Sequence, residues 1–293
     1  MKFTLTVSFC DPGFYLPLAQ AADASGFDAI CVADGLFWFD EIREKYPYTK
    51  DGERWWGPEM PFLDPWAVIP AMAAVTQRIH FYTNVMKFPV RHPLLLAKSI
   101  TTAAVLSGGR VGLGVGLSPW PEDYEVCGER WERRGPRSAE MIEIIREVAS
   151  GALVEHEGEF YRFPKLQIAP VPKQPIPIYV GGHAEGALRR AARIADGWIS
   201  ANVTSKELAP LVERVRALRA ELGPKGAPFE VKGLAIDVHD LDGFRRLRDM
   251  GITDAVVWPW HFYGGNANDL GHRIDVVRRF TDDVIEKLRE EGA

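Results

Sequence analysis

The chain has 293 residues, of which 46% are hydrophobic and 26% are charged, and its formal net charge at pH 7 is -5. This composition is typical of a globular protein with a large core. A net negative charge argues against a nucleic-acid partner, because phosphate contacts normally need clustered positive charge. No uninterrupted apolar run reaches the roughly 18 residues of a membrane-spanning helix, so we expect a cytoplasmic protein that does not bind membranes.

The reactive side chains do not form a metal site. Three cysteines, Cys10, Cys31 and Cys127, make no CxxC pair, and we interpret them as reduced thiols. The histidines form neither HxxxH nor HExxH, so we expect no bound metal. The stretch GLGVG at 112–116 lies inside a strand pattern with no helix directly behind it, so it does not indicate a dinucleotide site.

Short β-rich runs alternate with helical patterns along the chain. The strand patterns cover 2–9, 28–33, 79–85, 111–115, 176–180, 197–200, 229–238 and 255–258. The helical patterns cover 13–24, 64–76, 94–106, 137–150, 184–194, 206–222, 241–250 and 273–291. This alternation predicts parallel βαβ units, and eight such units close into a (β/α)8 TIM barrel. We predict one domain over 1–293, with an inserted loop at about 35–63 and a hairpin and Pro-rich insertion at about 153–175.

The active site of such a barrel lies at the carboxyl ends of its strands. Asp34 follows the apolar run ICVA, where a carboxylate is desolvated unless it meets a donor. We interpret Asp34 as functional, and a cap for the following loop is the alternative. Gly181 and Gly182 follow the strand pattern IPIYV and precede a helix whose free N–H groups favour an anion. A plain structural turn is the alternative there.

The segment 35–66 is dense in aromatic side chains, which are costly to leave in water. These side chains either line a ligand pocket or pack on one another or on a second copy of the chain. We place Phe37, Trp38 and Phe39, together with Trp120, in a substrate pocket. For proton transfer we single out His261 and Glu122, with Asp123 as a further candidate.

Several segments, taken in order, resemble the bacterial luciferase-like family of flavin- and deazaflavin-dependent oxidoreductases. The matching stretches are GFDAICVAD, LDPWAVIPAMAAVTQRIHFYTNV, FPVRHPLLLAKSITTAAVLSGGRVGLGVG, RRGPRSAEMIEIIRE and PIPIYVGGHAEGALRRAARIADGW. They cover most of residues 1–200. In addition, YPYTKDGERWW followed by LDPW resembles the inserted loop of a branch that uses coenzyme F420. The resemblance implies a luciferase-like barrel and a homodimer.

The same resemblance assigns roles to particular residues. It implies that Asp34 lies near the deazaflavin ring and that the peptide bond Asn84–Val85 is cis and packs behind that ring. It also implies that the amides of Gly181 and Gly182 hold the phosphate-bearing tail of the cofactor. The remaining residues that we place at the cofactor are Thr83, Val115, Gly116 and His183.

Two positions depart from the family's sugar-phosphate dehydrogenases. Those enzymes place His directly after the aspartate and Glu at the end of the fourth strand, where this chain has Gly35 and Leu117. We therefore expect a substrate other than a sugar phosphate.

The sequence thus predicts an oxidoreductase that transfers a hydride between F420 and a small organic substrate. Asp34 would orient the ring, and the aromatic insertion would exclude water. One alternative is an FMN-dependent two-component monooxygenase that uses oxygen and has a flavin reductase as its partner. Another alternative is a protein that binds F420 or a flavin without turnover.

Overall fold

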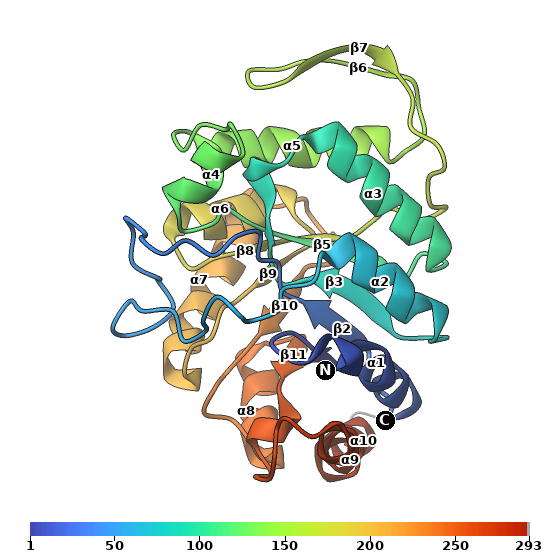
Figure 1. Ribbon diagram of the computed structural model, residues 1–293, viewed down its shortest axis with the longest axis vertical. Helices are drawn as coiled ribbons and strands as arrows, with labels where there is room; N and C mark the ends of the chain where they lie inside the picture. The colour runs from blue at the N-terminus through green and yellow to red at the C-terminus, as the bar shows by residue number, and fades with distance from the viewer. Residues whose placement is uncertain (292–293) are drawn as a thin grey trace.

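Parallel strands close into a ring in the computed structural model, which describes residues 1–291 (Figure 1). The ring order is β3-β2-β1-β11-β10-β9-β8-β5, and pairing of β3 with β5 closes it. The predicted barrel is therefore confirmed. Its strands are β1 (Lys2–Thr6), β2 (Ala29–Val32), β3 (His80–Thr83), β5 (Val111–Gly116), β8 (Ile178–Gly181), β9 (Gly197–Ile199), β10 (Glu230–Gly233) and β11 (Asp254–Val257).

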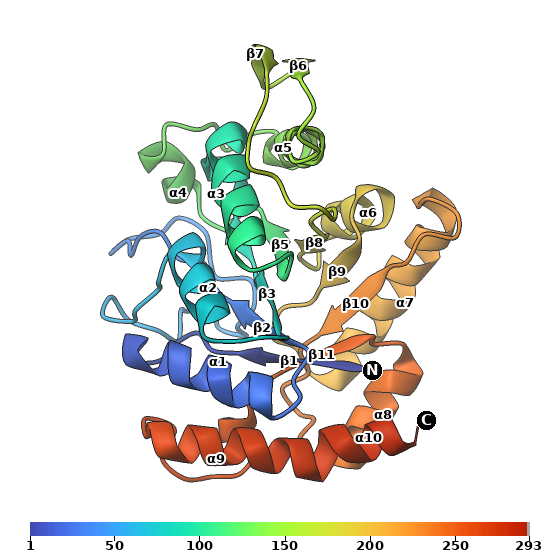
Figure 2. The ribbon, with the colours of Figure 1, turned by 90° about the vertical axis from the view of Figure 1, so that its right-hand side faces the viewer.

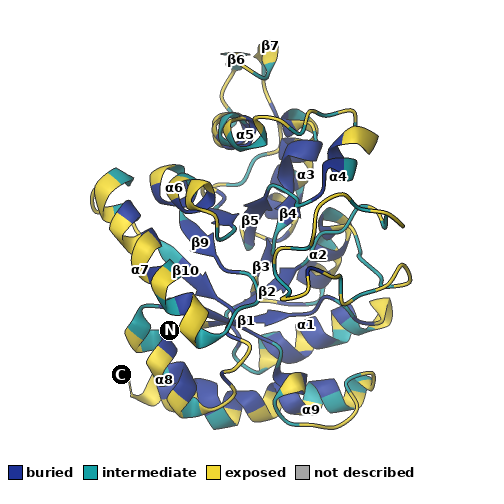
Figure 3. Ribbon diagram, turned by 90° about the vertical axis from the view of Figure 1, so that its left-hand side faces the viewer, coloured by how far each residue is buried: buried dark blue, intermediate teal, exposed yellow. Residues whose placement is uncertain are grey.

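Helices surround the ring, with their inner faces buried and their outer faces exposed (Figures 2 and 3). They are α1 (Tyr15–Ala24), α2 (Pro65–Ala74), α3 (Pro93–Leu106), α4 (Pro121–Val126), α5 (Arg134–Val148), α6 (Glu185–Ile194), α7 (Ser205–Leu222), α8 (Leu241–Met250), α9 (Leu270–Phe280) and α10 (Glu286–Glu290). Short turns of other helix types are η1 (Pro12–Phe14), η2 (Phe88–Val90), η3 (Pro259–His261) and η4 (Thr281–Ile285). The sequence did not predict α4.

Most predicted boundaries agree closely with the structure, but the strand predicted at 229–238 is too long. It ends at Gly233, and beyond that residue the chain makes an isolated parallel bridge between Ala235 and Val203. The Asp237 carboxylate accepts hydrogen bonds from the backbone N–H and hydroxyl of Ser205, at 2.6 and 2.8 Å. A side-chain contact with the start of α7 thus replaces strand pairing.

Two smaller features extend the barrel. The two-residue strand β4 (Met86–Lys87) pairs with the end of β5. Strands β6 (Val154–Glu157) and β7 (Arg162–Leu166) form an antiparallel hairpin that projects beyond α5 (Figures 1 and 2). This hairpin lies within the insertion predicted at 153–175.

Among the described residues, the structure supports neither a membrane-spanning helix nor a metal site. None of the helices within 1–291 has the length and apolar character that crossing a bilayer requires. The same residues contain no group of three or more His, Cys, Asp and Glu side chains arranged to hold a metal ion.

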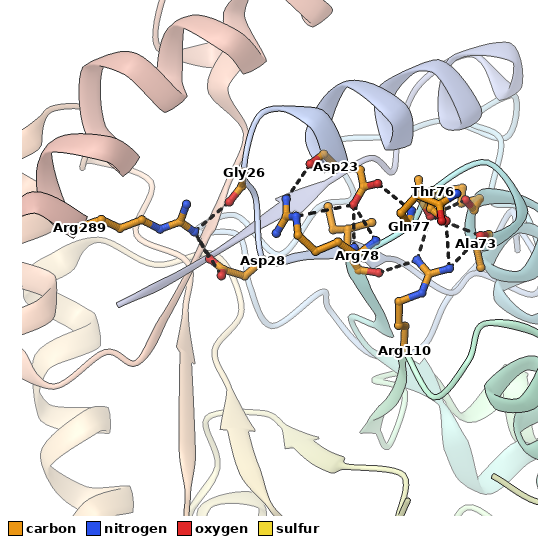
Figure 4. Close-up of polar contacts among 11 residues, drawn as sticks. Asp23, Gly26, Asp28, Ala73, Thr76, Gln77, Arg78, Arg110 and Arg289 are labelled. Carbon is orange, nitrogen blue, oxygen red and sulfur yellow. Dashed lines mark hydrogen bonds and ion pairs between the residues drawn. The ribbon is translucent and has the colours of Figure 1, made fainter. Parts of the chain in front are cut away.

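Polar contacts connect the loops at the amino-terminal end of the barrel (Figure 4). The Asp23 carboxylate accepts hydrogen bonds from three consecutive backbone N–H groups at 77–79, at 2.7 to 3.1 Å. The Arg110 guanidinium donates to backbone oxygens of Ala73, Thr76 and Ile79 at 2.9 to 3.2 Å. Arg289 of α10 donates to the Gly26 carbonyl at 2.8 Å, which connects the last helix to the loop before β2.

A buried ion pair occupies the barrel interior near the same end. Lys232 is 3% exposed, and its Nζ lies 2.6 Å from Oδ2 of the fully buried Asp254. Thr4 Oγ1 donates to Asp254 Oδ1 at 2.8 Å. The rings of Tyr82 and Tyr179 flank the ammonium at 4.5 and 4.4 Å from their centroids. Side chains therefore fill this half of the barrel interior, and their contacts stabilise the fold.

The inserted segment 33–64 has little regular structure and lies over the carboxyl ends of the strands. Its aromatic rings contact one another and the residues that follow several barrel strands. Trp55 lies 4.7 Å from Phe9, and Tyr48 lies 5.1 Å from His183, as measured between ring centroids. The insert therefore packs on itself, and it also lines a cavity at the mouth of the barrel.

Gly35 is the point where the insert closes on the barrel. A Cβ atom at this position would lie 2.6 Å from Cγ of Phe62, which is closer than real side chains approach. The Phe62 ring in turn packs edge-on against Phe9 at 5.2 Å. The absence of a side chain at position 35 is thus a packing requirement of this insert.

Replacement of Asp254 by Ala is expected to lower the free energy of unfolding by about 3 kcal/mol, because it removes the fully buried carboxylate beside Lys232 and leaves the more exposed Glu230, at 2.8 Å, to compensate the buried ammonium. Urea unfolding followed by circular dichroism measures this change. The control is Glu157→Gln, which removes a partner of Arg162 on the exposed hairpin and should have a much smaller effect. Equal effects of the two substitutions would contradict a structural role for the interior pair.

Replacement of Gly35 by Ala should displace the Phe62 ring and loosen the insert, because the added methyl group overpacks this contact. Limited trypsin digestion should then cleave several-fold faster at the exposed Lys45 and Lys50. Gly57→Ala is a matched control within the insert, since a Cβ there meets nothing within 4 Å. Unchanged cleavage in Gly35→Ala would rule out this explanation.

Candidate active site

A pocket of about 620 Å³ lies at the carboxyl ends of the barrel strands, beneath the insert. Phe9 and Trp258 line it where β1 and β11 end, and Gly182 lines it where β8 ends. Because β1 and β8 are separated by four steps around the eight-stranded ring, these residues face each other across the barrel. The pocket therefore spans the mouth of the barrel.

Most of the predicted site residues meet in this pocket. Those that line it are Asp34, Phe37, Trp38, Asn84, Val85, Gly116, Trp120, Gly181, Gly182 and His183. Five predicted residues are not among its lining: Thr83, Val115, Phe39, Glu122 and His261.

Asp34 is fixed by the Arg91 guanidinium and by the backbone N–H of Lys87. Its side chain is 2% exposed, and its two oxygens accept hydrogen bonds from the Arg91 guanidinium at 2.8 Å each. The backbone N–H of Lys87 donates to Oδ2, also at 2.8 Å. The carboxylate is therefore compensated by an ion pair and three hydrogen bonds, which suits a positioning role better than proton transfer.

The peptide bond between Asn84 and Val85 is cis, as the resemblance predicted. The Val85 side chain lies between two glycines of neighbouring strands. A Cβ at Gly116 would lie 2.5 Å from Val85 Cγ2, and a Cβ at Gly181 would lie 2.8 Å from Val85 Cγ1. Glycine at both positions thus lets Val85 form part of the pocket floor.

The turn after β8 combines an open backbone with a neutral histidine. Gly182 has φ +119°, a conformation that side-chain-bearing residues rarely adopt. The His183 Nε2 atom accepts a hydrogen bond from the backbone N–H of Ala201 at 2.9 Å, so the ring proton is on Nδ1. Burial lowers the pKa of His183, which keeps the ring neutral at pH 7.

The candidates for proton transfer are not brought together. Glu122 Oε1 accepts hydrogen bonds from the backbone N–H and Nε of Arg43, at 3.1 and 2.8 Å, and so connects α4 to the insert. Burial opposes ionisation of Glu122, but these hydrogen bonds lower its pKa. His261 is exposed, and Asp123 is fully buried beside Lys87. No shared site for proton transfer arises among these described residues.

Thr83 and Val115 instead belong to the sheet. The Thr83 hydroxyl donates to the Gly114 carbonyl at 2.6 Å and accepts from the Gly114 N–H at 2.9 Å. Val115 is a buried residue of β5. Both residues position the strands that carry the pocket floor.

Three cations line the pocket that the sequence reasoning missed: Lys87, Arg134 and Arg190. Lys87 Nζ lies 2.7 Å from Asp123 Oδ2 and 4.7 Å from the centroid of the Trp120 ring. The basic run RRGPR at 133–137 was the available signal for Arg134. Sequence alone does not tell which arginine of such a run faces the barrel mouth.

Residues 11–236 match the luciferase-like monooxygenase family. An uncharacterized protein of Mycobacterium tuberculosis is 44% identical over 291 residues, which cover 98% of this chain and 100% of that protein. An F420-dependent glucose-6-phosphate dehydrogenase of Nakamurella multipartita is 34% identical over 200 residues, 64% of this chain and 52% of that enzyme.

Solved structures with the same fold are more distant in sequence. An F420-dependent secondary alcohol dehydrogenase superimposes with a TM-score of 0.76 at 16% identity, covering 97% of this chain and 98% of its own. A monooxygenase of Streptomyces bottropensis superimposes with a TM-score of 0.74 at 17% identity, covering 98% of this chain and 100% of its own. The family match, which spans most of the barrel, decides the assignment: this chain belongs to the luciferase-like monooxygenase family.

Proposed function

We propose that this protein is an oxidoreductase that binds the deazaflavin coenzyme F420 in the pocket and exchanges a hydride with a small organic substrate. The observation that carries the proposal is the distribution of polarity in the pocket. Aromatic side chains from Phe9, Trp55 and Trp258 line the part near β1 and β11. The opposite part has an open glycine turn and the cations Arg134 and Arg190.

This distribution fits a cofactor with a planar ring and an anionic tail. Glycines and a helix N-terminus present backbone N–H groups to a phosphate, and aromatic and apolar surfaces accept a ring. A cavity of about 620 Å³ is in the range of pockets that bury small organic ligands. The named activity of the Nakamurella relative favours F420 over FMN as the cofactor.

Different residues of the chain would hold the cofactor, orient its ring and exclude water. Gly182 and the amides at the start of α6 would hold the phosphate-bearing tail, and Val85 would support the ring from behind. The Asp34–Arg91 pair would orient the ring through a fixed charge distribution. The insert would exclude water from the reacting atoms. When bound, F420 supplies the hydride donor or acceptor.

The substrate differs from that of the named relative. Gly35 and Leu117 replace the acid–base pair of the family's sugar-phosphate dehydrogenases, and Phe62 fills the space beside position 35. The aromatic lining from the insert favours a substrate with substantial apolar surface.

Purified protein titrated with F420 and with FMN should bind F420 at least about tenfold more tightly, a difference of about 1.4 kcal/mol in binding free energy. Quenching of protein fluorescence or of the cofactor's own emission measures both dissociation constants. Hydride exchange with a panel of carbonyl, imine and enoyl compounds should follow as a change in deazaflavin absorbance.

Tighter binding of FMN with oxygen uptake would instead identify an FMN-dependent monooxygenase, and the named Streptomyces neighbour is also called a monooxygenase. Stoichiometric binding of F420 without exchange with any compound of the panel would indicate a binding protein without turnover.

A further inference from the structure

A buried carboxylate beside the pocket holds two side chains that line it. Asp123 is fully buried and is not among the lining residues, whereas Lys87 and Ser118 are. Lys87 Nζ lies 2.7 Å from Asp123 Oδ2 and 3.0 Å from Oδ1. The Ser118 hydroxyl donates to Oδ2 at 2.5 Å. Asp123 therefore does not meet a ligand itself, but it fixes two groups that line the pocket.

The backbone brings these two side chains to the pocket floor from adjacent strands. Lys87 ends β4, two residues after Val85, and β4 pairs with the end of β5. Ser118 follows β5 and has φ +56°, a left-handed conformation that residues with a side chain seldom adopt. Such a conformation persists only where the surroundings enforce it, and it is concentrated at functional sites.

The Lys87 ammonium retains hydrogen-bonding capacity. A lysine has three N–H donors, and within residues 1–291 the hydrogen-bond partner of this ammonium is the Asp123 carboxylate. The Lys87 side chain is only 9% exposed, and its Nζ lies 4.7 Å from the centroid of the Trp120 ring. That ring stacks on Tyr46 of the insert at 5.9 Å. A ligand oxygen that reached Lys87 would therefore accept a charge-assisted hydrogen bond in a site with little water.

Charge pairing decides which ligand group fits beside Lys87. Asp123 neutralises the ammonium, and Arg91 likewise neutralises Asp34. An anionic group would meet the Asp123 carboxylate as well as the ammonium, whereas a neutral carbonyl oxygen needs only a donor. An ammonium can also supply a proton to that oxygen. The aromatic lining accepts apolar substituents of the same molecule.

We propose that Lys87 is the catalytic acid of this protein and that its substrates are uncharged aldehydes or ketones with an apolar or aromatic substituent. The proposal rests on the proposed function for the source of the hydride. Lys87 Nζ donates a hydrogen bond to the carbonyl oxygen, and Asp123 positions the ammonium. Lys87 thus has the role that the sequence suggested for Glu122 and His261.

The chemical step balances with these groups. Hydride transfer to the carbonyl carbon moves the π electrons of the C=O bond onto the oxygen. A proton from Lys87 Nζ completes the hydroxyl group, so the ketone is reduced by two electrons to an alcohol. Reduced F420, the hydride donor, is oxidised by two electrons and releases its other hydrogen as a proton. Lys87 is left neutral and regains a proton from solvent.

A binding experiment tests the contact with the carbonyl oxygen without turnover. The probes are acetophenone and α-methylstyrene, in which a C=CH2 group replaces the C=O group. Both are titrated into the complex with oxidised F420, which has no hydride to give, and fluorescence reports binding. Lys87→Met should weaken acetophenone binding by about tenfold, because a charge-assisted hydrogen bond is lost. Binding of α-methylstyrene should change by less than about twofold, and that of F420 by less than about threefold.

A rate measurement tests proton donation. With reduced F420 and acetophenone, Lys87→Met should lower kcat by about 100-fold or more, which is the usual contribution of a positioned acid. Asp123→Asn keeps the ammonium but loosens its position, so it should lower kcat several-fold with α-methylstyrene binding unchanged. Lys206→Met removes an exposed lysine of α7 and should leave binding and kcat unaffected.

A second variant allows for the buried carboxylate that Lys87→Met leaves unpaired. Thermal unfolding verifies that each variant is folded before it is measured. If Lys87→Met is not folded, Lys87→Met combined with Asp123→Asn takes its place. The double variant removes both charges together, and the Asn side chain keeps an acceptor for the Ser118 hydroxyl. It should show the same loss of ketone preference and of kcat.

Equal weakening of both probes, weakening of neither, or an unchanged kcat in a folded variant would overturn the role of Lys87. A wild type that does not prefer acetophenone to α-methylstyrene, or does not reduce it, would overturn the substrate class. Tight binding of F420 would still support the proposed function in these cases. A wild type that does not bind F420 would overturn the proposed function, while a ketone preference of the free protein that depends on Lys87 would still support the carbonyl contact.

Discussion

Closure of the sheet is the constraint on which the rest of this structure depends. Pairing of β3 with β5 completes the ring and leaves no free strand edge among the eight parallel strands described. All carboxyl ends then meet on one face, so residues as distant in sequence as Phe9, Gly182 and Trp258 line one cavity. The opposite end is filled by the Lys232–Asp254 pair and connected by Asp23, so stability and chemistry occupy separate ends.

Charge is distributed unevenly within the pocket. Asp34 and Lys87, which lie close together near β4, each have a partner of opposite sign, Arg91 and Asp123, and so add little net charge. Arg134 and Arg190, on the helices that follow β5 and β8, instead have buried Nε atoms that form no hydrogen bond within residues 1–291. A chain with a formal net charge of -5 therefore presents a locally positive wall to a ligand. The field inside a cleft depends on such local pairing more than on overall charge.

Sequence patterns predicted the barrel because the strand and helix periods are local and repeat eight times. Residues at strand ends, such as Asp34, could be predicted for the same reason. Family resemblance added the prediction of a cis peptide bond at Asn84–Val85. Side-chain contacts between residues distant in sequence could not be predicted from these local patterns. Glu122 was chosen for proton transfer, but it is bound by Arg43 from the insert, some eighty residues earlier. Arg190 was missed because only the packed helix shows which of its faces reaches the pocket.

The contact between Gly35 and Phe62 has a consequence for how specificity changes in such a barrel. Gly35, three residues after the end of β2, and the Phe62 ring, near the end of the insert, compete for the same volume. Neither can be exchanged for its counterpart in a relative without the other. During divergence, position 35 and the insert are therefore expected to have changed together. An engineer who transfers a substrate-binding loop between relatives would need to move both as one module.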